Sequence, residues 1–136
     1  MDLRLRAAVA LVIDLALVGL FVVIGRASHR EDQSAFLVTY WPFAVGLLVG
    51  WAGARGWRRP FSVSRTGVLA WVGTVLVGML LRWASDQGVQ VAFVVVASIV
   101  VGALLLGWRV LLAAIDRSAS RDRDTPGPVG FFLRRR

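Results

Sequence analysis

Apolar residues along this chain gather in four long runs separated by short polar segments. The runs cover residues 7–25, 36–54, 67–84 and 89–115. Apolar stretches of about 18 or more residues are typical of transmembrane helices, because a helix rising about 1.5 Å per residue then crosses the ~30 Å hydrocarbon core. The pattern predicts an all-α fold, a four-helix transmembrane bundle over residues 1–115, followed by a polar and basic tail over residues 116–136.

The composition also indicates a membrane protein, and it argues against several kinds of catalytic and metal-binding site. Hydrophobic residues make up 57% of the chain and the mean hydropathy is +0.70, which would leave a soluble domain of this size with a large exposed apolar surface. No cysteine and one histidine are present, so thiolate chemistry and a histidine-based metal site are not expected. No catalytic motif is found either. We expect no metal, no cofactor and no enzymatic activity.

The arginines predict the orientation of the helices. Every basic residue is an arginine, and with the N-terminus inside, thirteen of the sixteen fall on the inner side. Cytoplasmic loops carry this excess of positive charge, so both termini are expected in the cytoplasm. Arginine without lysine suggests a GC-rich bacterial genome and hence a bacterial plasma membrane. Because the basic runs flank membrane helices, nucleic acid is not an expected partner despite the net charge of +8.

One carboxylate interrupts the first apolar run. Asp14 stands in LVIDLALV, about 10 Å along the helix from its inner end, and Arg109 lies about 9 Å from the inner end of the fourth run. The first and last helices of an up-down bundle are antiparallel and can be neighbours. Since charges in a bilayer usually have a partner, we predict an intramembrane Asp14–Arg109 ion pair. The pair could pin the bundle or serve as a proton or ion relay, or Asp14 could be protonated and merely tolerated in the bilayer; pinning is the favoured interpretation.

A second polar cluster is expected at the other side of the membrane. Arg26 and His29 follow the first helix, and Arg82 ends the third at a similar depth. They could form a cationic mouth, pair with nearby carboxylates, or contact lipid headgroups. Near the start of the second helix, Pro42 should kink the chain. The segment with Thr39, Trp41 and Pro42 is therefore either a candidate cavity wall or a plain bend at the start of the helix.

Small residues are spaced for close helix packing. They recur at four-residue intervals within the last three runs, and such spacing lets membrane helices approach closely; the candidates are Gly46, Gly50, Thr74, Gly78 and Gly102. Packing within one bundle and packing between copies in a homo-oligomer are both compatible with this pattern. The six tryptophans lie mostly near the predicted helix ends, which favours the aromatic belt of membrane proteins over the alternative, an aromatic-lined binding cleft.

The C-terminal tail ends in an apolar triplet and three arginines, FFLRRR, residues 131–136. It is either a solvated tail or an anchor in which Phe131 to Leu133 enter the interface and Arg134 to Arg136 meet anionic lipid headgroups.

Four segments resemble one known family. They are GRASH at residues 25–29, TYWPFAVGLLVGW at 39–51, RTGVLAWVGTVLVGMLLR at 65–82 and VAFVVVASIVVGALLLGWR at 91–109. With the first helix they are similar to the domain of unknown function 3054, a family of small bacterial and archaeal membrane proteins, over roughly residues 8–112. The resemblance implies a four-helix membrane protein and no known activity. The positions that match its pattern are Asp14, Gly25, Arg26, His29, Trp41, Pro42, Arg82, Trp108 and Arg109.

Two functions follow as hypotheses. The first is a non-enzymatic accessory or structural membrane component, working as a homo-oligomer or within a larger membrane complex. The second is a small transporter or channel for protons or anions that uses the polar clusters at both ends. A transporter needs a polar path between the clusters, and the sequence offers mainly Thr74 and Ser98 there. The first hypothesis is therefore favoured.

Overall fold

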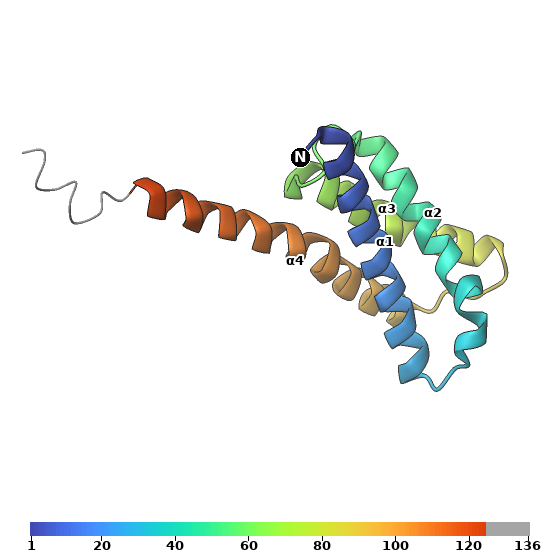
Figure 1. Cartoon of the computed structure of the whole chain (residues 1–136). Helices are drawn as coiled ribbons and strands as arrows, with labels where there is room; N and C mark the ends of the chain where they lie inside the picture. Colours follow the sequence, from blue (N-terminus) through green and yellow to red (C-terminus); the bar gives the residue numbers. More distant parts are fainter. Residues whose placement is uncertain (125–136) are drawn as a thin grey trace, which may run out of the picture.

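The chain forms an all-helical bundle in the computed structural model, which describes residues 1–124 (Figure 1). Within these residues there is no strand, and four helices are long and apolar enough to cross a membrane. Their bounds are α1 Leu3–Ser28, α2 Phe36–Ala54, α3 Val68–Ala84 and α4 Val91–Asp124. A 3-10 turn, Gln33–Ala35, precedes α2, and a π-helical turn, Val63–Gly67, precedes α3. The expected class, an all-α protein with four apolar spans, is confirmed.

The helix ends differ from expectation most clearly in α4. Its helix continues through residues 116–124, which were expected to belong to the tail. Charged and small residues such as Arg117 and Ala119 are compatible with a helix, and the first proline after Pro60 comes only at position 126. Hydropathy therefore marks where the apolar surface ends rather than where the helix ends. Figure 1 shows this last part of α4 projecting away from the other helices. The FFLRRR segment lies outside the described residues.

Helices α2 and α3 pack through glycine backbones. A Cβ atom built at Gly46 would lie 2.6 Å from the carbonyl oxygen of Gly73, and one at Gly50 would lie 2.2 Å from the carbonyl oxygen of Leu69. A Cβ at Gly78 would lie 2.8 Å from the ring of Phe43. Real Cβ atoms cannot sit so close, so this contact depends on the absence of side chains. Gly73 is the one glycine of this face that the four-residue spacing did not single out.

Thr74 and Gly102 also pack inside the chain. Thr74 is fully buried, and its Cα would lie 3.1 Å from a Cβ at Gly46. Gly102 of α4 faces the indole of Trp71, which a Cβ there would meet at 2.9 Å. The small residues that could have served either a bundle or a homodimer are thus occupied by contacts within one chain.

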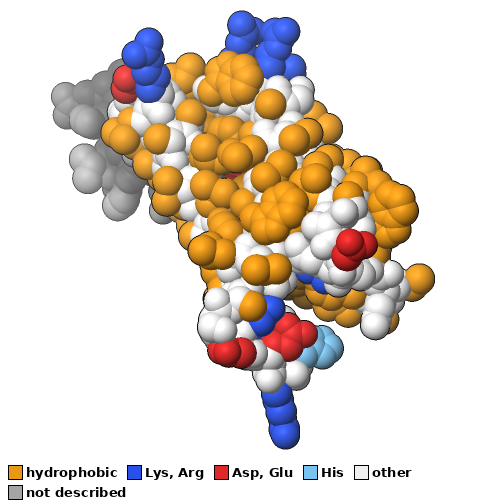
Figure 2. Space-filling model, turned by 90° about the vertical axis from the view of Figure 1, so that its right-hand side faces the viewer, with side chains coloured by type: hydrophobic (Ala, Val, Ile, Leu, Met, Phe, Trp, Pro, Cys, Tyr) orange, Lys and Arg blue, Asp and Glu red, His pale blue; other side chains and the backbone are white. Residues whose placement is uncertain are grey.

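Most charged side chains visible in Figure 2 lie toward the two ends of the bundle, and the surface between them is largely apolar, apart from an acidic side chain at mid-height on the right. Many large apolar side chains of the bundle are exposed, among them Val12, Leu76, Leu80 and Ile99. The N-terminus and the loop between α2 and α3 lie at one end, and the loop between α1 and α2 lies at the other (Figure 1). This distribution fits a protein whose sides face lipid.

The glycine contact predicts a sharp difference between two neighbouring positions. Gly50→Ala should force α2 and α3 apart and destabilise the folded protein by about 1–3 kcal/mol, as overpacking does. Gly53→Ala is the matched control, because a Cβ at Gly53 would meet nothing within 4 Å. Thermal unfolding of both variants in the same detergent measures the effect. An unchanged melting temperature in Gly50→Ala would contradict the close packing.

Candidate functional site

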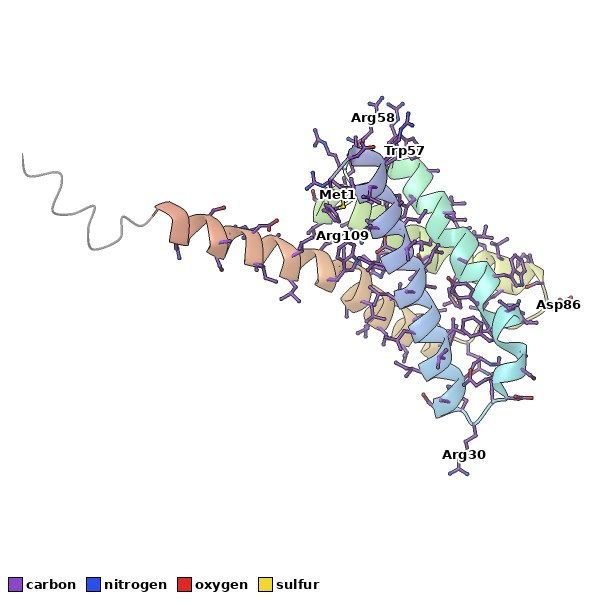
Figure 3. The ribbon with its side chains drawn as sticks, in the orientation of Figure 1. Met1, Arg30, Trp57, Arg58, Asp86 and Arg109 are labelled. Carbon is purple, nitrogen blue, oxygen red and sulfur yellow. The ribbon has the colours of Figure 1, made fainter. Side chains whose placement is uncertain are left out.

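The most enclosed polar site joins the first and last helices. Asp14 of α1 and Arg109 of α4 have no exposed surface, and they form a two-pronged ion pair. The Arg109 Nη2 atom lies 2.6 Å from Asp14 Oδ2, and Nη1 lies 2.8 Å from Oδ1. Figure 3 labels Arg109, on the part of α4 that lies beside α1. The structure thus brings together the two charges that the depth argument paired.

Two tryptophans complete the surroundings of the carboxylate. The indole N–H of Trp51 donates to Asp14 Oδ2 at 2.8 Å, and that of Trp108 donates to Oδ1 at 2.9 Å. With the two bonds from Arg109, the carboxylate accepts four hydrogen bonds from described residues. Charge-assisted bonds of this kind are the strong ones in a medium of low dielectric. The ion is held in place from α1, α2 and α4 together.

The guanidinium of Arg109 has partners beyond the carboxylate. Its Nη1 also donates to the carbonyl of Leu105 at 2.9 Å, and its Nε donates to the carbonyl of Pro60 at 3.1 Å. The group lies 4.6 Å from the centre of the Trp108 ring, in reach of a cation–π interaction. A Cβ at Gly67 would come within 3.2 Å of the Arg109 Cδ atom, so glycine there leaves room for the arginine stem.

The loop between α2 and α3 closes the site from the end of the bundle. Phe61 packs edge-on against Trp108, with ring centres 5.9 Å apart, and Arg6 lies 5.3 Å above the Phe61 ring. The fold of the loop is held by Thr66, whose hydroxyl donates to the carbonyl of Arg59 at 2.6 Å. The arginine-rich loop between α2 and α3 therefore covers the ion pair.

The aromatic-belt interpretation is wrong for part of the tryptophan set. Trp51 is buried and Trp108 half-buried, and both bind Asp14. Trp41, Trp57 and Trp83 are exposed, as a belt requires. The sequence did contain a signal for these two tryptophans. Trp108 directly precedes Arg109, and Trp51 lies about one turn before the end of α2, at the same side of the membrane as the ion pair.

The second predicted cluster lines a cleft near the opposite end of the bundle. Arg26, His29 and Arg82 all border this cleft, which lies between α1 and α4 and has a volume of about 620 Å³. We call it the lateral cleft; its further walls come from Phe21, Ile24, Glu31, Thr39, Phe43, Gln87, Phe93, Val96 and Val100. His29 is exposed and is the C-cap residue of α1. The structure thus brings these three residues to one cavity, although no contact joins the two guanidinium groups.

Arg26 is neutralised by its own loop. Its Nη1 lies 3.0 Å from Glu31 Oε2 and donates to the hydroxyl of Thr39 at 2.7 Å. Its Nε donates to the carbonyl of Asp32 at 3.0 Å. Two hydrogen bonds from the hydroxyl and the amide of Ser34 hold the pKa of Asp32 below its usual value, and the nearby charge of Arg26 acts in the same direction.

Of the three α2 residues predicted to line a cavity, only Thr39 does so. Thr39 borders the lateral cleft, whereas Trp41 is exposed and Pro42 is buried. The helix continues through Pro42 from Phe36 to Ala54. Thr39 accepts a hydrogen bond from Arg26, a contact for which the proline gave no indication.

An aromatic layer separates the two polar sites. The ring centres of Phe21 and Phe43 are 5.5 Å apart, and Phe93 lies 6.3 Å from Phe21 and 6.2 Å from Phe43. The two hydroxyls that the sequence offers for a polar path across this layer bond within their own helices instead. Thr74 donates to the carbonyl of Ala70, and Ser98 donates to that of Val94.

Comparison with known families identifies the chain. The model of the family described as a protein of unknown function, DUF3054, matches residues 11–112. The chain belongs to the DUF3054 family. No curated protein and no solved structure matches it. The DUF3054 segment contains both polar sites and the aromatic layer, and it ends just beyond Arg109. The predicted resemblance is thereby confirmed, and the helical extension of α4 over residues 116–124 lies outside the matched segment.

The geometry predicts that the ion pair acts as a unit in stability. Removing one partner leaves a buried charge uncompensated, so Arg109→Leu should cost about 3–5 kcal/mol. Replacing both charges, in Asp14→Leu with Arg109→Leu, should recover part of that loss. Thermal unfolding in detergent measures the coupling. Arg117→Leu removes an exposed charge from the same helix and is the control. Strictly additive losses from the two single variants would contradict the pairing.

Proposed function

We propose that this DUF3054 protein is a non-enzymatic accessory or structural component of a bacterial plasma membrane. It spans the bilayer four times with both termini in the cytoplasm. The arginine distribution supports this orientation, since the end of the bundle that carries the N-terminus also carries Arg55, Arg58 and Arg59.

The observation that carries the proposal is the completeness of the Asp14 site. A proton relay needs a carboxylate with a path for protons to reach it and a geometry that changes with its protonation. Asp14 is fully buried, accepts four hydrogen bonds from described residues, and is covered by the loop that contains Phe61. Such a site favours one fixed state, and its role is to pin α1, α2 and α4 together.

The alternative function, transport of protons or anions, finds less support. The path from the lateral cleft to Asp14 would have to cross the layer of Phe21, Phe43 and Phe93. The hydroxyls of Thr74 and Ser98 both donate to carbonyl groups of their own helices. Moving an ion through that layer would expose it to apolar surroundings without a partner, which costs several kcal/mol.

An accessory role requires association with a second copy or with other membrane proteins. The face of α2 that carries Gly46 and Gly50 packs against α3 of the same chain. Association would therefore use surface elsewhere, and it need not disturb the α2–α3 contact.

Flux measurements separate the two functions. Purified protein reconstituted into liposomes should show no proton or halide flux above that of empty liposomes, because the aromatic layer interrupts the path. Asp14→Asn should give the same baseline as the wild type in a pH-dye assay. Clear flux that disappears in folded Asp14→Asn protein would overturn the accessory function in favour of transport.

Copurification tests the accessory role directly. The tagged full chain, isolated in mild detergent, is expected to elute in a complex larger than one copy in its detergent micelle. Gly53→Leu adds a large side chain at an exposed position that faces no other part of the chain. Comparing its elution with that of the wild type therefore tests whether this surface takes part in the association. Elution of the wild type as a single copy without partners, across several mild detergents, would contradict the proposal.

A further inference from the structure

Arg82 is a cation that forms no salt bridge within the described part of the chain, although Glu31, which pairs with Arg26, attracts it at longer range. Arg82 is half-buried near the end of α3. Its terminal nitrogens donate to the side chain of Gln87 at 3.1 Å and to the carbonyls of Gln87 and Gly88 at 3.4 Å. Its Nε–H is buried and has no hydrogen-bond partner among the described residues. A partly desolvated arginine with an unused donor is an incomplete site.

The contrast with the other cations of the bundle is informative. Arg109 is neutralised by Asp14, and Arg26 is neutralised by Glu31. Arg82 instead lies over aromatic rings, 4.9 Å from the centre of Phe93 and 5.8 Å from that of Phe43. Cation–π contacts orient a guanidinium but leave its charge in place. Glu31 is thus the one carboxylate that faces two arginines in the lining of the lateral cleft, Arg26 and Arg82, so these walls carry a net positive charge.

Below Arg82 the cleft is apolar. Phe93, Val96 and Val100 form one wall on α4, and Phe21 faces them from α1. Ile24 and Val96, at the two edges, are each 54% exposed, so the cleft opens sideways between α1 and α4. In the apolar band of a membrane protein such an opening faces acyl chains. Its volume of about 620 Å³ lies within the range of small-molecule sites.

We propose that the lateral cleft binds one anionic phospholipid of the adjacent leaflet. The phosphate lies against Arg82, and one acyl chain follows Phe93, Val96 and Val100 down to the aromatic layer. A charged guanidinium supplies charge-assisted hydrogen bonds to phosphate oxygens. The apolar wall gives a lipid an advantage over free phosphate, and the unneutralised charge gives an anionic lipid an advantage over a zwitterionic one. The inference does not depend on the accessory function, because it uses none of the residues around Asp14.

Lipid titration of the purified full chain tests this site. Native mass spectrometry in a neutral detergent gives the dissociation constants for phosphatidylglycerol and phosphatidylcholine. We expect phosphatidylglycerol to bind about tenfold more tightly, a factor that corresponds to ~1.4 kcal/mol, because the choline cation of phosphatidylcholine offsets the charge of its phosphate. Arg82→Gln should remove most of this preference. Arg30→Gln is the matched control, because it also removes one positive charge near the loop between α1 and α2. Arg30 is exposed, and its side chain points away from the bundle (Figure 3).

A second variant probes the acyl-chain part of the cleft without changing charge. Val96→Trp fills the exposed edge and should weaken phosphatidylglycerol binding, with thermal unfolding used to verify that the variant is folded. Inorganic phosphate at millimolar concentration should not displace the lipid. Equal affinities for the two lipids would overturn the proposal. So would a preference that survives in folded Arg82→Gln protein, or displacement of the lipid by inorganic phosphate alone.

Discussion

A carboxylate with no exposed surface in an apolar bundle has to find all of its hydrogen bonds inside the protein. Asp14 finds them on α4, through Arg109 and Trp108, and on α2, through Trp51. Arg109 in turn needs the carbonyl of Pro60 in the following loop. Because an unpaired charge in hydrocarbon is so costly, satisfying this single group fixes the mutual placement of three helices and one loop.

The glycine contact between α2 and α3 makes that placement possible. Gly50 and Gly73 bring the two backbones together, and Trp51 is the residue that follows Gly50. On a helix, neighbouring side chains point about 100° apart, so a glycine turned toward α3 directs the next indole toward α1. Close packing on one side of α2 and hydrogen bonding on the other are thus two consequences of one local sequence, GW at positions 50–51.

Much of this fold could be predicted from sequence because the bilayer limits the choices. The bounds of α2 and the matching depths of Asp14 and Arg109 follow from apolar run lengths and the helical rise. The roles of the Pro60 carbonyl and of Phe61 could not be predicted, since they depend on how a loop folds back, which periodicity does not encode. The end of α4 was wrong for another reason: backbone hydrogen bonds continue the helix after the apolar surface has stopped.

The two polar sites also differ in what they leave unsatisfied, and this difference separates stability from binding. Around Asp14, charge is balanced and water is excluded, so further ligands have nothing to contact. Arg82 has no salt bridge with a described carboxylate, one of its donors is unused, and a cleft opens beside it. The layer of Phe21, Phe43 and Phe93 keeps the sites apart. Because that layer and the ion pair hold the helices in place, the lateral cleft keeps its shape without a ligand, and a bound lipid would lose little affinity to reorganisation of the protein.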